Sequence, residues 1–371
     1  MNFDFSDDQK SLKDQARKVL ADKSSIKAVR AVLDRKPGAP SYDQDLWKAV
    51  AELGWLGIAI PEEYGGVGLG RLELCVLAEE LGRAVAPIPF ASTVYFATEA
   101  LLLAGSDAQK QKWLPKIASG EAIGCFALSE GPGAPKPDAI TTTFDGSALS
   151  GAKIPVADGD IAHFAIVLAK EGAGTSLVIA ELDGVKRSEV KTLDPTRGHA
   201  KIEFAKTKAE RLGKAGEGWD LADAVLDRAA VLLAFEQVGG AQACLDMAVD
   251  YAKNRYAFSR QIGSFQAIKH KLADMYVAAE VARSNAYYGA WALSTEAPEL
   301  PLAAAAARVA ATEAYHLASK ENIQTHGGMG FTWEVDCHLF YRRAKLLAVQ
   351  AGGPGVWKEK LVRRLELKNA A

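Results

Sequence analysis

Three features are scarce in this sequence, and each scarcity excludes a class of protein. The four cysteines, Cys75, Cys125, Cys244 and Cys337, never form a Cys-x-x-Cys pair, which argues against a disulfide framework and against a zinc site. No apolar run reaches the length of a membrane span, and the acidic start MNFDFSDD lacks the basic and apolar segments of a signal peptide. We therefore expect a cytoplasmic protein with reduced thiols, no metal and no contact with a membrane.

An excess of charge of one sign is also missing. The 44 Lys and Arg residues nearly balance the 46 Asp and Glu residues, for a formal net charge of -2, so nothing favours a nucleic acid as the partner. Hydrophobic residues make up 49% of the chain and charged residues 24%, as in an ordinary globular enzyme. At 371 residues the chain is long enough for two or three domains.

The order of periodic segments predicts a mainly α protein with a small β domain. Residues 1–117 read as an N-terminal α-helical domain, in which Ser6 is the expected N-cap of the first helix and Gly54 a stop signal. Residues 118–215 hold short runs rich in β-branched and aromatic residues between Gly, Pro and Asp turns, which predicts a middle β domain. Residues 216–371 contain three helical windows of more than twenty residues each, which predicts a C-terminal helical bundle.

Two loops of the C-terminal block carry candidate binding residues. In NRYAFSRQIGSFQ, Arg255, Phe258 and Gln266 lie between two helices, where a guanidinium, an aromatic ring and an amide could hold a dinucleotide. The alternative interpretation is an ordinary polar loop without a binding role. In IQTHGGMGF, Gly327 and Gly328 follow a helix instead of a strand, so the Rossmann interpretation fails and glycines that let a ligand approach the backbone remain.

Several segments, in this order and spacing, resemble the acyl-CoA dehydrogenase family over nearly the whole chain. They are PEEYGGVGLG, the β block after Ser129-Glu130, the Arg-x-x-Phe loop, QTHGGMGF and RRAK. The segment GGMGFTWEVDCHLFYRRAK is most similar to sequences of a bacterial branch of the family. That branch includes small subunits of pimeloyl-CoA dehydrogenases and subunits of steroid side-chain dehydrogenases. The resemblance implies a helical domain, a β domain and a four-helix bundle, a dimer of dimers, and FAD across the subunit interface.

The resemblance also assigns residues to the cofactor. Arg255, Phe258 and Gln266 would meet the ADP half of an FAD that belongs partly to a neighbouring subunit. Its adenine and pyrophosphate would lie against Gln324, Gly327 and Gly328, and the segment Leu128, Ser129 and Glu130 would face the flavin. Oxidation of an acyl-CoA thioester between Cα and Cβ is the implied reaction, with electron-transfer flavoprotein as the implied acceptor.

The base of that reaction is missing from its usual place. Most relatives have Glu-Gly-Thr a few residues after the Arg-x-Ala-Lys, and this chain has Ala351, Gly352 and Gly353 there. Ala351 is then a substrate-contacting residue whose backbone N–H could donate to the thioester carbonyl. Some relatives supply the carboxylate from the first bundle helix, but the corresponding position is Ala229. We therefore assign no catalytic residue in this chain.

Nearby acids are poor substitutes on geometric grounds. Glu236 lies within about 20° of the face of Ala229 but about 10 Å further along the helix axis, so its simpler interpretation is a carboxylate paired with Lys or Arg. Asp227 points away and is expected to be solvated or paired with Arg. Pro155 and Val156 replace a Trp-Ile-Thr stretch that contacts the flavin in relatives.

Three hypotheses remain open. The leading one is a subunit of a heterotetramer whose partner, a second acyl-CoA dehydrogenase chain, supplies the base. The alternatives are an active homotetramer with an unusual base such as Glu236, and a non-catalytic protein that binds acyl-CoA or acts as a scaffold.

Overall fold

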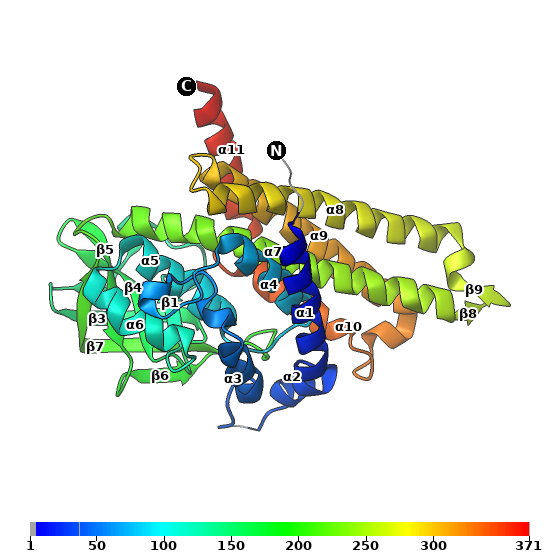
Figure 1. The fold of residues 1–371 in the computed structure, drawn as a ribbon, viewed down its shortest axis with the longest axis horizontal. Coiled ribbons are helices and arrows are strands. Elements are labelled where there is room, and N and C mark those ends of the chain that lie inside the picture. Colours follow the sequence, from blue (N-terminus) through cyan, green and yellow to red (C-terminus); the bar gives the residue numbers. More distant parts are fainter. Residues whose placement is uncertain (1–4, 37, 371) are drawn as a thin grey trace. The chain divides into compact units, whose positions relative to one another are not determined.

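The computed structural model describes residues 5–36 and 38–370 (Figure 1). The chain forms two compact units, each assembled from segments that are distant in the sequence. The first, here called the bundle unit, consists of Met1–Val29, Cys75–Ala86 and Ala230–Ala371, and the second, here called the barrel unit, consists of Arg30–Leu74 and Pro87–Ala229. The mainly α architecture with a small β part is confirmed, while the three sequence blocks stay a prediction about domains.

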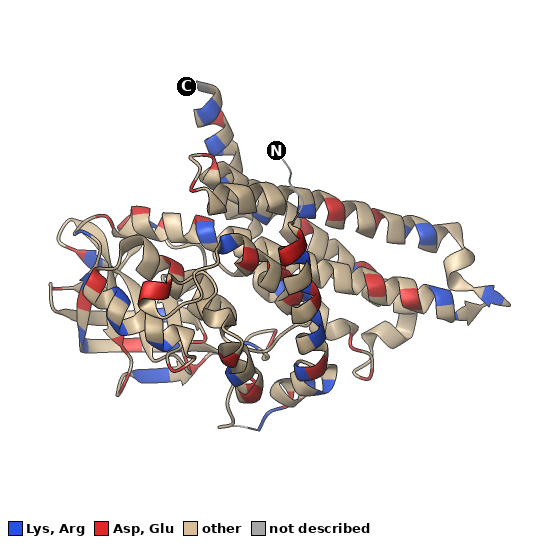
Figure 2. Cartoon of the chain, viewed as in Figure 1, with Lys and Arg blue, Asp and Glu red and all other residues tan. Residues whose placement is uncertain are grey.

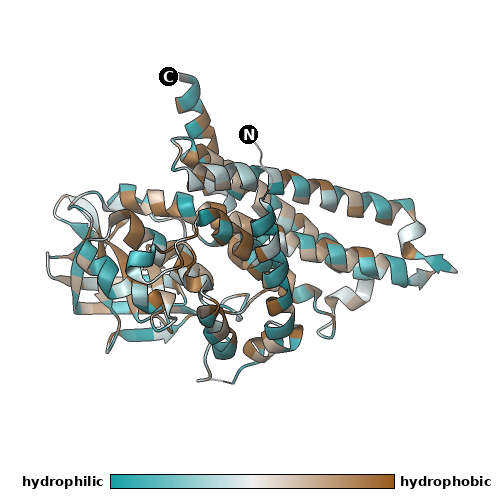
Figure 3. Ribbon diagram, in the orientation of Figure 1, coloured by the Kyte–Doolittle hydropathy of each residue, from teal (hydrophilic) through white to brown (hydrophobic). Residues whose placement is uncertain are grey.

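Long helices make up the bundle unit. Helix α8 packs along α9, and α10 and α11 also pack on α9. Ala dominates the buried positions of α9, which permits close helix approach. Most of α1 is hydrophilic, whereas α8 mixes hydrophobic and hydrophilic residues (Figure 3). Its elements, of which α4 and α7 have their first residues in the barrel unit, are α1 (Asp7–Lys23), α4 (Arg71–Arg83), α7 (Gly218–Asn254), β8 (Tyr256–Ala257), β9 (Arg260–Gln261), η5 (Ile262–Ser264), α8 (Gln266–Ser294), α9 (Leu300–His326), η6 (Gly327–Phe331), α10 (Cys337–Val349) and α11 (Pro354–Ala370).

The barrel unit combines short helices with a seven-stranded sheet. Strands β4, β2, β3, β7 and β5 pair in that order and β5 returns to β4, while β1 adds to β4 and β6 to β7. The elements are α2 (Ile26–Leu33), α3 (Gln44–Glu52), η1 (Trp55–Gly57), η2 (Glu62–Tyr64), the π-helix η3 (Ala91–Thr98), α5 (Glu99–Ala104), α6 (Asp107–Ala118), β1 (Gly124–Ala127), η4 (Pro137–Ala139), β2 (Thr143–Phe144), β3 (Ala148–Ala157), β4 (Phe164–Glu171), β5 (Gly174–Glu181), β6 (Lys186–Glu189) and β7 (His199–Leu212).

The expected helix signals operate as the sequence indicates. Ser6 caps α1 in a capping box with Gln9, which satisfies two backbone donors at the helix start. Gly54, just past α3, has φ 74°, the left-handed conformation that ends many helices. In the part of the chain that the structure describes, no helix is both long enough and apolar enough to cross a membrane.

Two glycines permit a close helix crossing in the bundle unit. A Cβ added to Gly82 on α4 would lie 1.9 Å from the carbonyl oxygen of Glu236 on α7, and one added to Gly239 would lie 1.8 Å from that of Glu79. Neither position tolerates a side chain, because both obstacles are backbone atoms. The crossing fixes the part of α7 that carries Glu236 and Gln237.

Candidate functional site

The loop after α7 is a β-hairpin with a two-residue tip that exposes an aromatic ring. Here the hairpin loop means residues 255–265. Phe258 and Ser259 form its tip with φ of 53° and 63°, a left-handed conformation that Asn and Gly usually occupy in such turns. The side chain of Phe258 is 90% exposed. A strained and exposed aromatic residue is a costly arrangement, which indicates a role in binding.

A second loop, here called the glycine turn (residues 327–331), follows α9 and lies beside the last turn of α7. The ring of Tyr251 stacks on His326 with centroids 4.1 Å apart, and its hydroxyl donates to Sδ of Met329 at 3.8 Å. Gly327 has φ 62°, and nothing lies within 4 Å of a Cβ added to Gly327 or Gly328. The hairpin loop and the glycine turn therefore occupy the same end of the bundle unit (Figure 1).

The residues at this end fit the ADP half of FAD. Arg255, Gln266 and Gln324 are exposed, and the Arg255 side chain makes no hydrogen bond or ion pair with the described residues. A free guanidinium suits a pyrophosphate, and bare glycine backbone allows a nucleotide to approach closely. Basic residues are visible at the hairpin in Figure 2, although both signs of charge are mixed over the rest of the ribbon.

The break between α10 and α11 is a tight turn whose backbone carbonyls accept hydrogen bonds from buried side chains. In this 350–353 turn, Ala351 has φ 63° and its carbonyl oxygen accepts a hydrogen bond from the indole of Trp357 at 3.0 Å. Arg308 on α9 donates to the carbonyl of Gln350 at 2.8 Å and also to the carbonyl of Leu347. Residues 350–353 include no acidic side chain.

Behind this turn lies a buried charge cluster on α7, α9 and α10. Glu236 and Arg343 are both 0% exposed and form an ion pair with N and O 3.6 Å apart. Arg308 also donates to the side-chain oxygen of Gln237, whose amide donates to Thr312 at 3.2 Å. The prediction that Glu236 is a paired carboxylate agrees with this environment. Asp227 is 4% exposed, which excludes the solvated alternative for its side chain, while the alternative of a pair with Arg stays a prediction.

In the barrel unit, an ion pair fixes the segment Leu128, Ser129 and Glu130. Lys153 on β3 is 0% exposed and donates to the carbonyl of Leu128 at 3.1 Å and to Glu130 at 2.8 Å. Burial alone would raise the pKa of Glu130, but hydrogen bonds from Lys153, Thr141 and Thr142 outweigh it and lower the pKa to about 2. Burial lowers the pKa of Lys153, and Glu130 opposes that shift. The backbone of the predicted flavin-facing segment is thus held by a buried cation.

Strand β3 also carries the two positions that replace the aromatic contact. Pro155 is exposed, Val156 is 0% exposed, and the Ile154–Pro155 peptide is cis. Neither side chain can donate a hydrogen bond.

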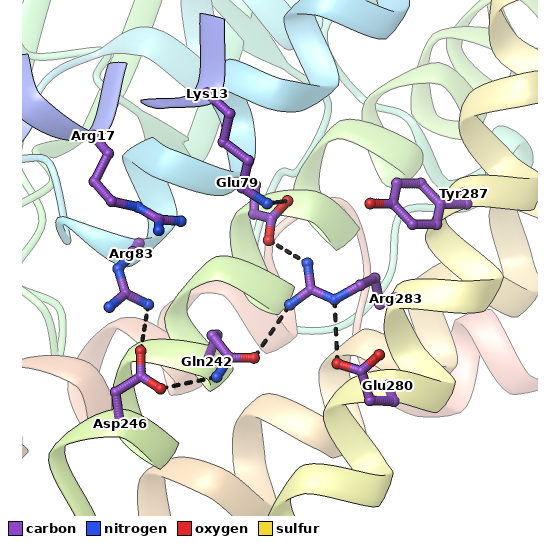
Figure 4. A pocket seen from close by; sticks show the side chains of 9 residues that line it. All are labelled: Lys13, Arg17, Glu79, Arg83, Gln242, Asp246, Glu280, Arg283 and Tyr287. Atoms are coloured by element: carbon purple, nitrogen blue, oxygen red, sulfur yellow. Dashed lines mark hydrogen bonds and ion pairs between the residues drawn. The ribbon is translucent and has the colours of Figure 1, made fainter. Parts of the chain in front are cut away.

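A charged pocket of the bundle unit was not expected from the sequence (Figure 4). Its charges pair across helices: Lys13 with Glu79 at 2.8 Å, Arg83 with Asp246 at 2.6 Å, and Arg283 with Glu79. Burial would raise the pKa of Glu79, but Arg283 and Lys13 outweigh it and lower the pKa. The pocket is therefore a network of ion pairs that joins α1, α4, α7 and α8. Its lining comprises Lys13, Arg17, Glu79, Arg83, Gln242, Asp246, Glu280, Arg283 and Tyr287.

The described residues hold no obvious metal centre. Within 5–36 and 38–370, no three His, Cys, Asp or Glu side chains are grouped so that they could bind a metal ion. All four cysteines are buried free thiols, and burial raises the pKa of Cys125 and Cys244, which keeps them protonated.

Comparison with known proteins assigns the family. A model of the acyl-CoA dehydrogenase N-terminal domain matches residues 6–121, and one of the C-terminal domain matches residues 216–366. Acyl-CoA dehydrogenase IpdE2 of Mycobacterium tuberculosis is 35% identical over 97% of this chain and 96% of its own length. This chain belongs to the acyl-CoA dehydrogenase family, whose members are oxidoreductases.

Two solved structures are similar along the whole chain. A chain of the ChsE4-ChsE5 complex from Mycobacterium tuberculosis superposes with a TM-score of 0.89 at 25% identity, covering 99% of both chains. A chain from a variant of the Tcur3481-Tcur3483 steroid ACAD superposes with a TM-score of 0.88 at 29% identity, covering 98% of this chain and 99% of that one.

Proposed function

We propose that this chain is a subunit of a heterotetrameric, FAD-dependent acyl-CoA dehydrogenase and that its partner chain supplies the carboxylate base. The observation that carries the proposal is the 350–353 turn, where Ala351 replaces the base. Glu236, the nearest candidate substitute considered, is 0% exposed and ion-paired with Arg343. A general base must reach the proton that it removes, and a buried carboxylate held by a guanidinium is poorly suited to that task.

The chain's contribution to the cofactor is the exposed end of the bundle unit. Arg255 would neutralise pyrophosphate charge, Phe258 would offer a ring face, and Gln266 would add an amide donor. From the glycine turn, Gln324, Gly327 and Gly328 would line the adenine and pyrophosphate. When bound, FAD accepts the hydride that leaves the β-carbon of the acyl chain.

The remaining proposed roles concern the flavin and the acyl thioester, and they are based on the family resemblance and on the small residues of the 350–353 turn. Leu128 and Ser129 would face the flavin from the barrel unit, with their backbone held by Lys153. Ala351 would contact the thioester, and its backbone N–H would donate to the thioester carbonyl. Since Ala351, Gly352 and Gly353 leave room, a bulky ring-bearing or dicarboxylic acyl group suits this turn.

Relatives support the assembly and the substrate class. The ChsE4-ChsE5 relative is a complex of two named chains, and the Tcur3481-Tcur3483 relative is named a steroid ACAD. We extend this to a partner chain and to acyl-CoA thioesters from lipid or steroid catabolism. Electron-transfer flavoprotein as the acceptor and a cytoplasmic location remain predictions.

The test is to purify the chain alone and together with a second acyl-CoA dehydrogenase chain from the same source. Flavin absorbance and acyl-CoA oxidation are measured for each sample. We expect little flavin and no turnover from the lone chain, and both from the complex. One flavin per chain with full activity in the lone protein would contradict the proposal, and a colourless complex without turnover would favour a scaffold.

A further inference from the structure

One peptide group of the 350–353 turn joins a buried cation to an available donor. The carbonyl oxygen of Gln350 accepts a hydrogen bond from Nη2 of Arg308 at 2.8 Å. The N–H of the same peptide group belongs to Ala351, and it makes no hydrogen bond to any residue that the structure describes. In a trans peptide the C=O and N–H point in opposite directions. A cation on the carbonyl therefore strengthens the N–H as a donor on the opposite side.

Arg308 is held where it can do this. It is 1% exposed on α9, and it also donates to the carbonyl of Leu347 and to the side-chain oxygen of Gln237. Burial lowers the pKa of Arg308 to about 10, and the charge of Glu236 opposes the shift. The guanidinium thus stays protonated at neutral pH. Its partners come from α7 and from the end of α10, so it fixes the turn against the bundle.

We propose that Arg308 is a positioning residue for the acyl thioester: it orients and polarises the Gln350–Ala351 peptide so that the Ala351 N–H donates to the thioester carbonyl. The proposal rests on the proposed function, which assigns the 350–353 turn to the thioester. It also adds to it, because a chain without a base keeps a carbonyl-binding donor. Such a site binds acyl-CoA without oxidising it.

A purely structural role for Arg308 is the competing explanation, and the turn contains its own control. The indole of Trp357 donates to the carbonyl of Ala351, which belongs to the next peptide group. The N–H of that group belongs to Gly352 and is already bonded to the carbonyl of Val349 at 3.2 Å. Trp357→Phe therefore loosens the turn without removing the cation from the Gln350–Ala351 peptide.

The experiment uses the complex with its partner chain, whose base is replaced by the corresponding amide so that the probe is not consumed. The probe is cyclohexanecarboxyl-CoA with a ¹³C-labelled thioester carbonyl, and its stretching band is followed by difference infrared spectroscopy. We expect a band shifted to lower frequency on binding. Arg308→Met should lose this shift for the site on this chain and weaken probe binding there by about tenfold. Arg308→Lys should retain part of the shift, and Trp357→Phe should retain it fully.

Three results would overturn the inference. An unchanged carbonyl band in Arg308→Met, in protein that keeps its flavin, removes the polarising role. Equal loss of the shift in Arg308→Met and Trp357→Phe reduces Arg308 to a structural residue. If Arg308→Met does not fold, Arg308→Lys decides: complete loss of the shift in protein that keeps its flavin overturns the inference, and retention of part or all of the shift supports it. Failure of the proposed function is distinct, since the complex would then lack flavin or turnover before any substitution in this chain.

Discussion

The hairpin loop and the 350–353 turn both interrupt the bundle helices, yet they treat their polar groups in opposite ways. The hairpin loop exposes Arg255 and Phe258 and holds its tip in a left-handed conformation. In the 350–353 turn, buried Arg308 and Trp357 donate to the carbonyls of Gln350 and Ala351, and Ala351 stands at the position proposed for the base. In the proposed function, the hairpin loop binds a cofactor shared with another chain. The other is held by buried side chains and, in the proposed function, lacks the catalytic carboxylate.

Under the proposed function, this difference shows how a dehydrogenase fold can specialise as a subunit. Binding groups at the hairpin end would serve a cofactor shared with another chain, so they remain useful without a local base. A carboxylate is needed only where the chemistry occurs. Loss of the base therefore need not entail loss of the hairpin loop, and the two regions can be tested separately.

The largest expected effect on stability is that of Glu236→Gln. This substitution tests whether Glu236 acts as the catalytic base. The substitution removes the charge that faces buried Arg343, so it should lower the free energy of unfolding by about 3 kcal/mol. Turnover by the complex should persist. Urea unfolding and acyl-CoA oxidation measure the two effects. Glu359→Gln, at an exposed pair with Arg363, is the control and should change stability by less than about 0.5 kcal/mol. Abolished turnover with unchanged stability would instead identify Glu236 as the base.

Arg255→Ala tests the hairpin end and should come next in size. Loss of a charge-assisted contact to the pyrophosphate should weaken flavin retention by the complex by roughly tenfold to a hundredfold. Flavin left after dialysis gives the measurement. Arg260→Ala is the matched control, because this cation belongs to the same hairpin but packs over the ring of Phe265 at 4.0 Å. A similar loss in both variants would mean that only the local charge matters.

Ser259→Gly sharpens the argument about strain. Since Ser259 has φ 63°, glycine should relieve strain and stabilise the folded chain by about 1 kcal/mol. Ser264→Gly lies in the same loop at negative φ and should destabilise it by about 0.5 to 1 kcal/mol. Thermal unfolding of the two variants compares them. Equal destabilisation would show that the tip of the hairpin is not strained.

The smallest expected effect is the change with pH in the stability that Glu130 contributes. Hydrogen bonds lower its pKa from 4.5 to about 2 in the folded chain, so its ionised form stabilises the fold above about pH 4.5. That contribution is lost as the pH falls toward 2. Because the side chain is partly exposed, we expect less than about 1 kcal/mol. The stability difference between the native chain and Glu130→Gln should shrink on going from pH 7 to pH 3, and a constant difference would contradict the role of the Lys153 pair.

Much of the fold follows from local patterns, and the exceptions have physical reasons. The long helices α7, α8 and α9 lie in the C-terminal block where periodicity predicts three helical windows, and Ser6 caps α1 as expected. Strand β3 escapes prediction because it contains Gly151 and Pro155, both of which normally interrupt strands. A Cβ at Gly151 would lie 2.7 Å from Cα of Thr142, so tertiary packing selects the glycine.

Part of the candidate site could likewise be predicted from the sequence, and part could not. The hairpin loop and the glycine turn carry recognisable motifs, and the structure brings them together through Tyr251. Arg308 was missed because it belongs to no motif. Its only signal is a single cation within the apolar stretch AAAAARVAAT, which predicts a buried charge that needs partners. Those partners are the side chain of Gln237 and the carbonyls of Leu347 and Gln350, which are distant in the sequence, so sequence patterns do not indicate them.

The most direct test of the missing base is proton exchange at the α-carbon of the acyl group. The complex is prepared with the partner's base replaced by its amide, loaded with an acyl-CoA deuterated at Cα, and followed by mass spectrometry in ordinary water. If only the partner supplies the carboxylate, deuterium should stay on the α-carbon. Washout at the rate of the unmodified complex would mean that this chain provides a base of its own.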